Sequence, residues 1–285
     1  MKSKIKVSNL SENFKKRLLD GKFYKLEFNL EDSEKDIYDL TYLSSLSNFS
    51  AVDINLNSDF IYIAEEALNN SSIKARELEI NNYQKPLLFI SLETSSNLFL
   101  GVNFEQELEA LLDTSFDVFE LHVDYFDINS IKNKIYKVTN IFQNKLISLN
   151  CSRKKLSNAN IVEIIKSVKE FSKNKLIIEV DGISNQRNSN KYNQTLQTIS
   201  TADIVNKQLR DDEPKYKNVP LILSGGTNQS TSELAIQCSV PFNGISINSS
   251  YLSEITNETM FNFDRRNELI LSINYLKKFF NLNLI

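Results

Sequence analysis

Short apolar runs alternate with longer amphipathic stretches along the chain from residue 23 onward. The runs have the length of β-strands, whereas the stretches between them carry apolar residues at helical spacing, as Ile131, Ile135 and Val138 do in segment 128–142. This alternation is typical of repeated strand–helix units around a parallel sheet. The predicted strands are 23–28, 51–56, 86–92, 117–123, 145–151, 175–181, 219–224 and 243–247.

The number of units predicts the fold. Eight of them in about 230 residues match the size of a (β/α)8 barrel, so we predict an α/β chain with a TIM-like barrel as a single domain. The barrel is predicted over 21–255, after an N-terminal extension at 1–20 and before a C-terminal helix at 256–285 that packs on it. An open, doubly wound sheet of similar connectivity is the alternative.

Alternate side chains of a barrel strand face either the helices or the interior. One parity is apolar, as Val52 and Ile54 show, and is predicted to face the helices. The other parity is polar toward the strand ends: Lys25, Glu27, Asp53, Asn55, Ser91, Glu120, His122, Ser148, Asn150, Glu179, Asp181, Ser224, Ser246 and Asn248. A barrel built only for stability would fill these positions with Val, Ile and Leu, and barrel enzymes keep their chemistry at this end. The alternative is a polar mouth left over from an ancestral enzyme.

Five inward residues are candidates for catalysis: Lys25, Asp53, Glu120, His122 and Asp181. Lys25 and Asp53 lie on successive strands and are predicted to form an ion pair, in which Lys25 is a structural partner, an anchor for a ligand anion or a nucleophile. His122 is the only histidine, which excludes a catalytic triad and a multi-histidine metal site. With Glu120 it forms either a titratable pair in a functional cleft or a hydrogen-bonded pair inside the mouth.

Metal and cofactor sites are not predicted. The inward acids outnumber the inward bases, which leaves room for a divalent cation, but no spacing motif supports one. We interpret the polar end of the barrel as a hydrogen-bonded network whose negative charge Lys25 partly neutralises. Cys151 and Cys238 are too few for a disulfide framework or an iron–sulfur cluster. Cys151 has outward parity and is predicted to be an inert, buried thiol.

A ligand site is predicted where the seventh strand ends, at Ser224, Gly225, Gly226, Thr227 and Asn228. Adjacent glycines let backbone amides approach a ligand, and the following helix N-terminus offers further N–H groups to an anion such as phosphate. The alternative is that Thr227 and Asn228 only cap that helix.

Charge and hydropathy narrow the classes of partner. The 33 basic and 36 acidic residues give a net charge of −3, which is no reason to expect nucleic-acid binding. No window is apolar enough to span a membrane, and residues 1–13 lack the apolar run of a signal peptide, so a cytoplasmic, reducing location is expected.

Five segments resemble the light-dependent period protein (LdpA) family of cyanobacteria, and in particular its barrel domain. They read Gly-Lys-Phe-Tyr-Lys-Leu at 21–26, Ala-Val-Asp-Ile at 51–54, Phe-Glu-Leu-His at 119–122, Val-Asp-Gly at 180–182 and Leu-Ser-Gly-Gly-Thr-Asn at 223–228. A related plastid family of barrel proteins is similar too. The matching positions include all five catalytic candidates and 225–228, but the resemblance does not assign their roles.

The resemblance implies a cytoplasmic protein that links light or redox input to the circadian clock, with clock-associated proteins as partners. LdpA proteins carry a cysteine-rich insert that binds iron–sulfur clusters between the third and fourth strands, whereas segment 93–116 here contains no cysteine. We therefore expect no such cofactor in this chain.

Three classes of function remain open. The resemblance favours a regulatory or ligand-sensing barrel with a small anionic ligand; the alternatives are an enzyme on a small phosphorylated or carboxylated metabolite, and a scaffold with a vestigial mouth. Ligand binding would separate the third class from the others, and turnover would separate the first two.

Overall fold

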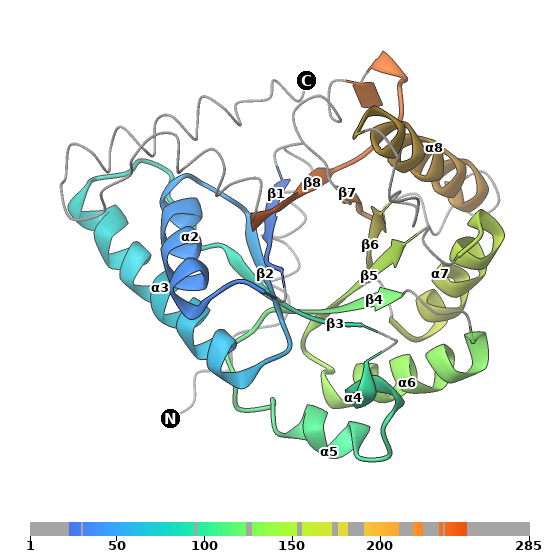
Figure 1. Ribbon diagram of the computed structural model, residues 1–285, viewed down its shortest axis with the longest axis horizontal. Helices are drawn as coiled ribbons and strands as arrows, with labels where there is room; N and C mark the ends of the chain where they lie inside the picture. The colour runs from blue at the N-terminus through green and yellow to red at the C-terminus, as the bar shows by residue number, and fades with distance from the viewer. Residues whose placement is uncertain are drawn as a thin grey trace.

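The computed structural model describes residues 23–29, 31–93, 96–123, 127–152, 156–172, 176–181, 191–210, 219–224, 234–235 and 237–249. Within them, eight strands form a closed barrel in which every neighbouring pair is parallel and β1 pairs with β8 (Figure 1). The strands are β1 Phe23–Glu27, β2 Ala51–Asn55, β3 Leu87–Glu93, β4 Val118–Val123, β5 Leu146–Ser152, β6 Leu176–Asp181, β7 Leu221–Ser224 and β8 Gly244–Asn248. The predicted barrel is confirmed, and the β1–β8 pairing excludes the open sheet.

Helices lie around the outside of the strands (Figure 1). They are α2 Glu34–Leu46, α3 Ser58–Glu77, α4 Asn97–Leu100, α5 Phe104–Glu109, α6 Ile128–Ile141, α7 Asn158–Ser172 and α8 Lys191–Arg210. Capping residues mark where two of these helices begin. Ser33 and Asp36 form a capping box on α2, and the Asp127 carboxylate accepts hydrogen bonds from two backbone amides at the start of α6. Between β3 and β4 the chain forms two short helices, α4 and α5, in place of one long one.

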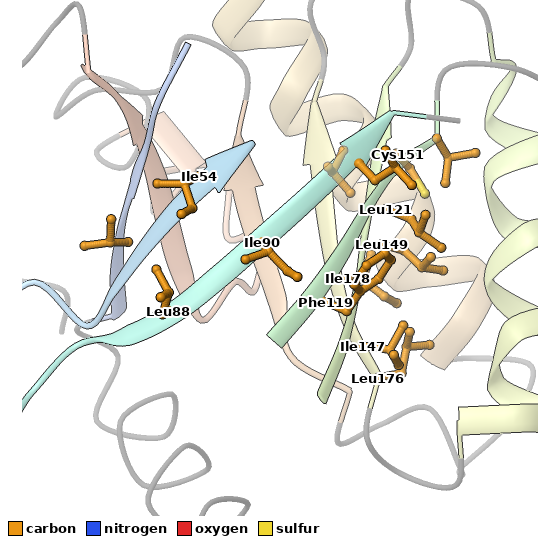
Figure 2. Packing of buried hydrophobic residues seen from close by; sticks show 14 of the residues in the cluster. Ile54, Leu88, Ile90, Phe119, Leu121, Ile147, Leu149, Cys151, Leu176 and Ile178 are labelled. Atoms are coloured by element: carbon orange, nitrogen blue, oxygen red, sulfur yellow. The ribbon is translucent and has the colours of Figure 1, made fainter. Parts of the chain in front are cut away.

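The outward parity of the strands forms the main hydrophobic core against the helices. Figure 2 shows side chains of this layer, among them Ile54 of β2, Phe119 of β4 and Leu149 of β5, which are all fully buried. The outward orientation predicted for Val52, Ile54, Phe119 and Cys151 is confirmed by their place in this core. The helices are thus held on the barrel by burial of the apolar, outward-facing side chains of the strands.

A second, smaller core fills the barrel interior below the polar residues. Its members come from the first three positions of strands β1 to β7: Phe23, Ala51, Leu87, Phe89, Val118, Leu146, Ile177 and Ile222. Gly244 is required beside it, because a Cβ there would lie 2.5 Å from the Phe23 carbonyl oxygen and 2.8 Å from the Phe23 Cβ. The apolar layer therefore closes one end of the barrel and leaves the polar residues at the carboxyl ends of the strands.

The predicted strands agree with the observed ones to within two residues at each end. The predicted extension at 1–20 and the predicted C-terminal helix at 256–285 lie outside the described residues. No helix in the described part of the chain is both long and apolar enough to cross a membrane.

Candidate functional site

A fully buried lysine lies at the centre of the polar part of the barrel. The Lys25 ammonium is 2.9 Å from Asp53 Oδ2, 2.8 Å from Glu120 Oε1 and 2.8 Å from Glu179 Oε2, and all four side chains are inaccessible to solvent. Lys25 also lies 5.2 Å from the centre of the Phe89 ring, which belongs to the apolar layer below. We call these four charged residues the Lys25 cluster.

The barrel geometry explains why three carboxylates reach one lysine. Asp53, Glu120 and Glu179 stand on β2, β4 and β6, and side chains from alternate strands of a (β/α)8 barrel meet in one layer of its interior. Lys25 comes from β1 and has a stem long enough to reach that layer. The predicted Lys25–Asp53 ion pair is confirmed, and it is one of three.

His122 stands at the exposed edge of the Lys25 cluster. Its Nε2 lies 2.9 Å from Glu120 Oε1 and 4.0 Å from Asp53 Oδ2. The His122 side chain is 23% exposed, in contrast to the buried carboxylates beneath it. The predicted pairing of His122 with Glu120 on one inward face is therefore confirmed.

Glu27 forms the other part of this edge. Its Oε2 accepts hydrogen bonds from Ser246 Oγ at 3.0 Å and from Ser224 Oγ at 3.3 Å. These hydroxyls come from β8, which pairs with β1, and from β7 on the far side of β8, so two strands from the end of the barrel order orient Glu27. On the opposite side, Asn150 donates to Glu179 Oε1 at 3.2 Å.

Burial and neighbouring charges determine the charge states in the Lys25 cluster. Burial lowers the pKa of Lys25, but the surrounding carboxylates raise it well above its ordinary value, so the ammonium stays protonated. Burial raises the pKa of Glu120, but Lys25 and His122 hold it well below its ordinary value. Burial raises the pKa values of Asp53 and Glu179. Burial lowers the pKa of His122, whereas its contacts with Asp53 and Glu120 raise it well above its ordinary value.

Several oxygen atoms in the barrel interior have no hydrogen-bond partner among the described residues. They are Asp53 Oδ1, Glu120 Oε2, Glu179 Oε2 and Ser148 Oγ, and each belongs to a fully buried side chain. A buried polar atom without a partner is unfavourable, so such atoms indicate a place where water or a bound group completes the site.

One set of residues has the geometry of cation ligands. A carboxylate oxygen of Glu27, a carboxylate oxygen of Asp53 and a ring nitrogen of His122 all lie within 4.8 Å of one another. These three side chains are therefore candidate ligands for a divalent cation, besides donating and accepting hydrogen bonds.

The structure brings four of the five catalytic candidates together: Lys25, Asp53, Glu120 and His122. Asp181 ends β6, where it is half-buried and lies opposite Ser224 in the strand register. Of the predicted ligand site, Ser224 is buried and bound to Glu27, whereas Gly225, Gly226, Thr227 and Asn228 lie outside the described residues.

The predicted role of Lys25 as an anchor for a ligand anion does not fit this geometry. The Lys25 ammonium donates hydrogen bonds to Asp53 and Glu120 and lies 2.8 Å from Glu179 Oε2; it is fully buried, and three carboxylates already offset its charge. The same contacts disfavour the nucleophilic role, which requires an uncharged amine.

Strand parity places Glu27 and Glu179 on the inward face, but the sequence pattern does not single them out as catalytic candidates. The pairs predicted from the sequence lie on one strand or on successive strands, whereas Glu179 reaches Lys25 across the barrel. The alternate-strand layering of (β/α)8 barrels is the signal that could have identified Glu179. Cys151 is buried as predicted, and burial raises the pKa of its thiol to about 12.

No family model matches the sequence, and no curated protein matches it. Solved structures are similar in fold. A Toxoplasma gondii ME49 protein assigned as a deoxyribose-phosphate aldolase is 12% identical, with a TM-score of 0.57 over 93% of this chain and 99% of that chain. Fructose-bisphosphate aldolase from Campylobacter jejuni is 11% identical, with a TM-score of 0.56 over 96% and 92%. The YdjI aldolase from Escherichia coli K12 is 14% identical, with a TM-score of 0.50 over 93% and 92%. At these identities, the likeness establishes the TIM-barrel fold.

Proposed function

We propose that this chain is an enzyme that acts on a small phosphorylated or carboxylated metabolite at the carboxyl end of its barrel. The observation that carries the proposal is the convergence of charged side chains from β1, β2, β4 and β6 on one network with a solvent-facing edge at Glu27 and His122. In (β/α)8 barrel enzymes this end of the barrel holds the active site.

The cost of the Lys25 cluster supports a functional origin. Burying ionised groups costs several kcal/mol for each ion, and well-packed apolar residues of similar volume are often as stable or more so. The barrel interior does use apolar residues in the layer below, around Phe23 and Phe89. The charged side chains of the Lys25 cluster, above that apolar layer, are therefore better explained by a role in catalysis or binding than by a contribution to the stability of the fold.

The similar solved structures support the substrate class by analogy. Two of them carry names of aldolases for phosphorylated sugars, deoxyribose phosphate and fructose bisphosphate. In this chain Lys25 would act as a positioning residue, because its ion pairs hold the carboxylates in place. The reacting part of the substrate would meet the edge formed by Glu27 and His122.

Binding and turnover of a panel of phosphosugars and small carboxylates test this proposal, with 2-deoxyribose 5-phosphate, fructose 1,6-bisphosphate and 2-oxo acids as probes. We expect at least one probe to bind in calorimetry and to be converted, with and without added divalent cations compared. The His122→Gln variant should lose the conversion. Glu93→Gln is the control, because Glu93 is exposed at the end of β3 opposite His122 in register. Failure of every probe to bind would contradict the proposal.

A ligand-sensing role of the LdpA type is the second proposal. In its favour, Lys25, Asp53, Glu120 and His122 stand at positions that carry the resemblance, and they converge in one network. Binding of a probe without any conversion would favour this role over the enzyme. Clock-associated partners remain a prediction.

A further inference from the structure

We propose that Glu27, Asp53 and His122 form a binding site for one divalent first-row transition-metal ion in the mouth of the barrel. Their ligand atoms lie within 4.8 Å of one another. Ligands at about 2.1 Å from a single ion are separated by at most about 4.2 Å. The partly exposed Glu27 and His122 can close this difference by small rotations of their side chains.

The charge around these atoms favours a cation. Four carboxylates, those of Glu27, Asp53, Glu120 and Glu179, surround the single ammonium of Lys25. Lys25 lies within 2.9 Å of the three buried carboxylates, and His122, whose pKa is lowered by burial but raised on balance by the neighbouring carboxylates, is a second cationic group beside Glu27, so the carboxylates still outnumber the cationic groups among the described residues of the site. A divalent ion beside Glu27 and Asp53 would offset the excess negative charge.

One of the proposed ligands also carries a buried oxygen atom without a partner. Asp53 is fully buried, its Oδ2 contacts Lys25, and its Oδ1 has no hydrogen-bond partner in the described part of the chain. An unsatisfied carboxylate oxygen is costly away from water. A metal ion with its bound water would satisfy it, and Asp53 is one of the three proposed ligands.

Each proposed ligand is also held by a second residue, as ligands are at established metal sites. His122 Nε2 contacts Glu120, which is the carboxylate–histidine arrangement that orients an imidazole toward a metal. When the imidazole is neutral and Nε2 donates to Glu120, Nδ1 carries the lone pair that a metal ion would need, so binding of the ion would displace the second ring proton. Ser224 and Ser246 hold Glu27, and Lys25 holds Asp53.

The ligand set indicates the class of ion. Two carboxylates and one imidazole with open positions suit Mn²⁺, Fe²⁺ or Zn²⁺, whereas Ca²⁺ and Mg²⁺ prefer oxygen ligands throughout. The open positions would accept water or the oxygen atoms of an anionic ligand, which the carboxylates alone would repel. This inference goes beyond the proposed function and does not depend on it.

Titration of the EDTA-treated chain with Mn²⁺, followed by the electron paramagnetic resonance signal of free Mn²⁺, tests the site without any metabolite. We expect one bound Mn²⁺ per chain, displaced by Zn²⁺ but only weakly by Mg²⁺. Glu27→Gln and His122→Gln should each weaken binding about tenfold or more. Glu93→Gln, an exposed acid at the same end of the barrel, should leave binding unchanged.

Absence of Mn²⁺ binding, or binding that survives in both ligand variants, would overturn the proposal. Thermal unfolding in EDTA verifies that the variants are folded. Ser246→Ala provides a milder test, since it removes a hydroxyl that holds Glu27 and should weaken Mn²⁺ binding by a smaller factor. Because the titration contains no metabolite, its failure would leave the test of the proposed enzyme intact.

Discussion

At the scale of single residues, Lys25 determines the electrostatics of the barrel interior. It is fully buried and forms ion pairs with three fully buried carboxylates. Removing one partner of a buried ion pair leaves an uncompensated charge, which is far more unfavourable than losing an exposed pair.

Replacing Lys25 should therefore destabilise the chain strongly. We expect Lys25→Met, which keeps much of the stem, to lower the free energy of unfolding by about 3–5 kcal/mol in urea titrations. Lys74→Met is the matched control, since Lys74 pairs with Glu77 on the surface of α3, and its loss should cost at most about 1 kcal/mol. Equal losses in the two variants would argue against an ion-paired Lys25.

The two cysteines provide a second test at this scale. Cys151 is buried with a thiol pKa raised to about 12, whereas Cys238 is exposed. At pH 8 only about one Cys151 in ten thousand would be a thiolate, which is the reactive form. A thiol reagent should therefore label Cys238 quickly and label Cys151 only after unfolding, as peptide mass mapping can show.

At the scale of elements, the strands could be predicted because each is a short apolar run with consistent parity. The outward sets of β2, β4 and β6 read directly from the sequence as helix-facing residues. The contacts of Glu179 and Glu27 could not be read in the same way, because they depend on strands far apart in the chain. Parity determines which face a side chain occupies, whereas the barrel closure determines which side chains meet.

The seam between β1 and β8 gives a prediction at this scale. Gly244→Ala places a Cβ 2.5 Å from the Phe23 carbonyl oxygen and 2.8 Å from the Phe23 Cβ, so the two strands must separate. We expect a loss of about 1–3 kcal/mol or more in unfolding free energy, measured by thermal or urea denaturation. Phe23→Leu combined with Gly244→Ala should not restore stability, because the closest contact is with backbone. Full recovery in the double variant would show that the Phe23 ring, and not the strand spacing, sets the constraint.

At the scale of the whole molecule, the barrel combines an apolar layer with a charged layer above it. The sequence predicts the barrel and four of the residues that meet inside it. The anion site predicted at 224–228 stays a prediction, because residues 225–228 lie outside the described part of the chain.

If the Lys25 cluster is kept for function, replacing all four of its charged side chains should lower the free energy of unfolding less than replacing Lys25 alone. We expect a chain with Lys25→Met, Asp53→Val, Glu120→Leu and Glu179→Leu to be more stable in urea than Lys25→Met alone, by a few kcal/mol, because it buries no unpaired charge. The same chain should bind no Mn²⁺. A combined variant less stable than the single one would indicate that these positions tolerate only polar side chains.

The two serines that hold Glu27 have a consequence for assembly during synthesis. Glu27 and its fellow proposed ligands lie on β1, β2 and β4, whereas Ser224 and Ser246 lie on β7 and β8, the last strands described. A nascent chain that has emerged only through β4 thus carries all three proposed ligands, but it lacks the two serines that hold Glu27. These serine contacts form only when β8 joins β1, so full affinity for the proposed ion would follow closure of the barrel and would report it.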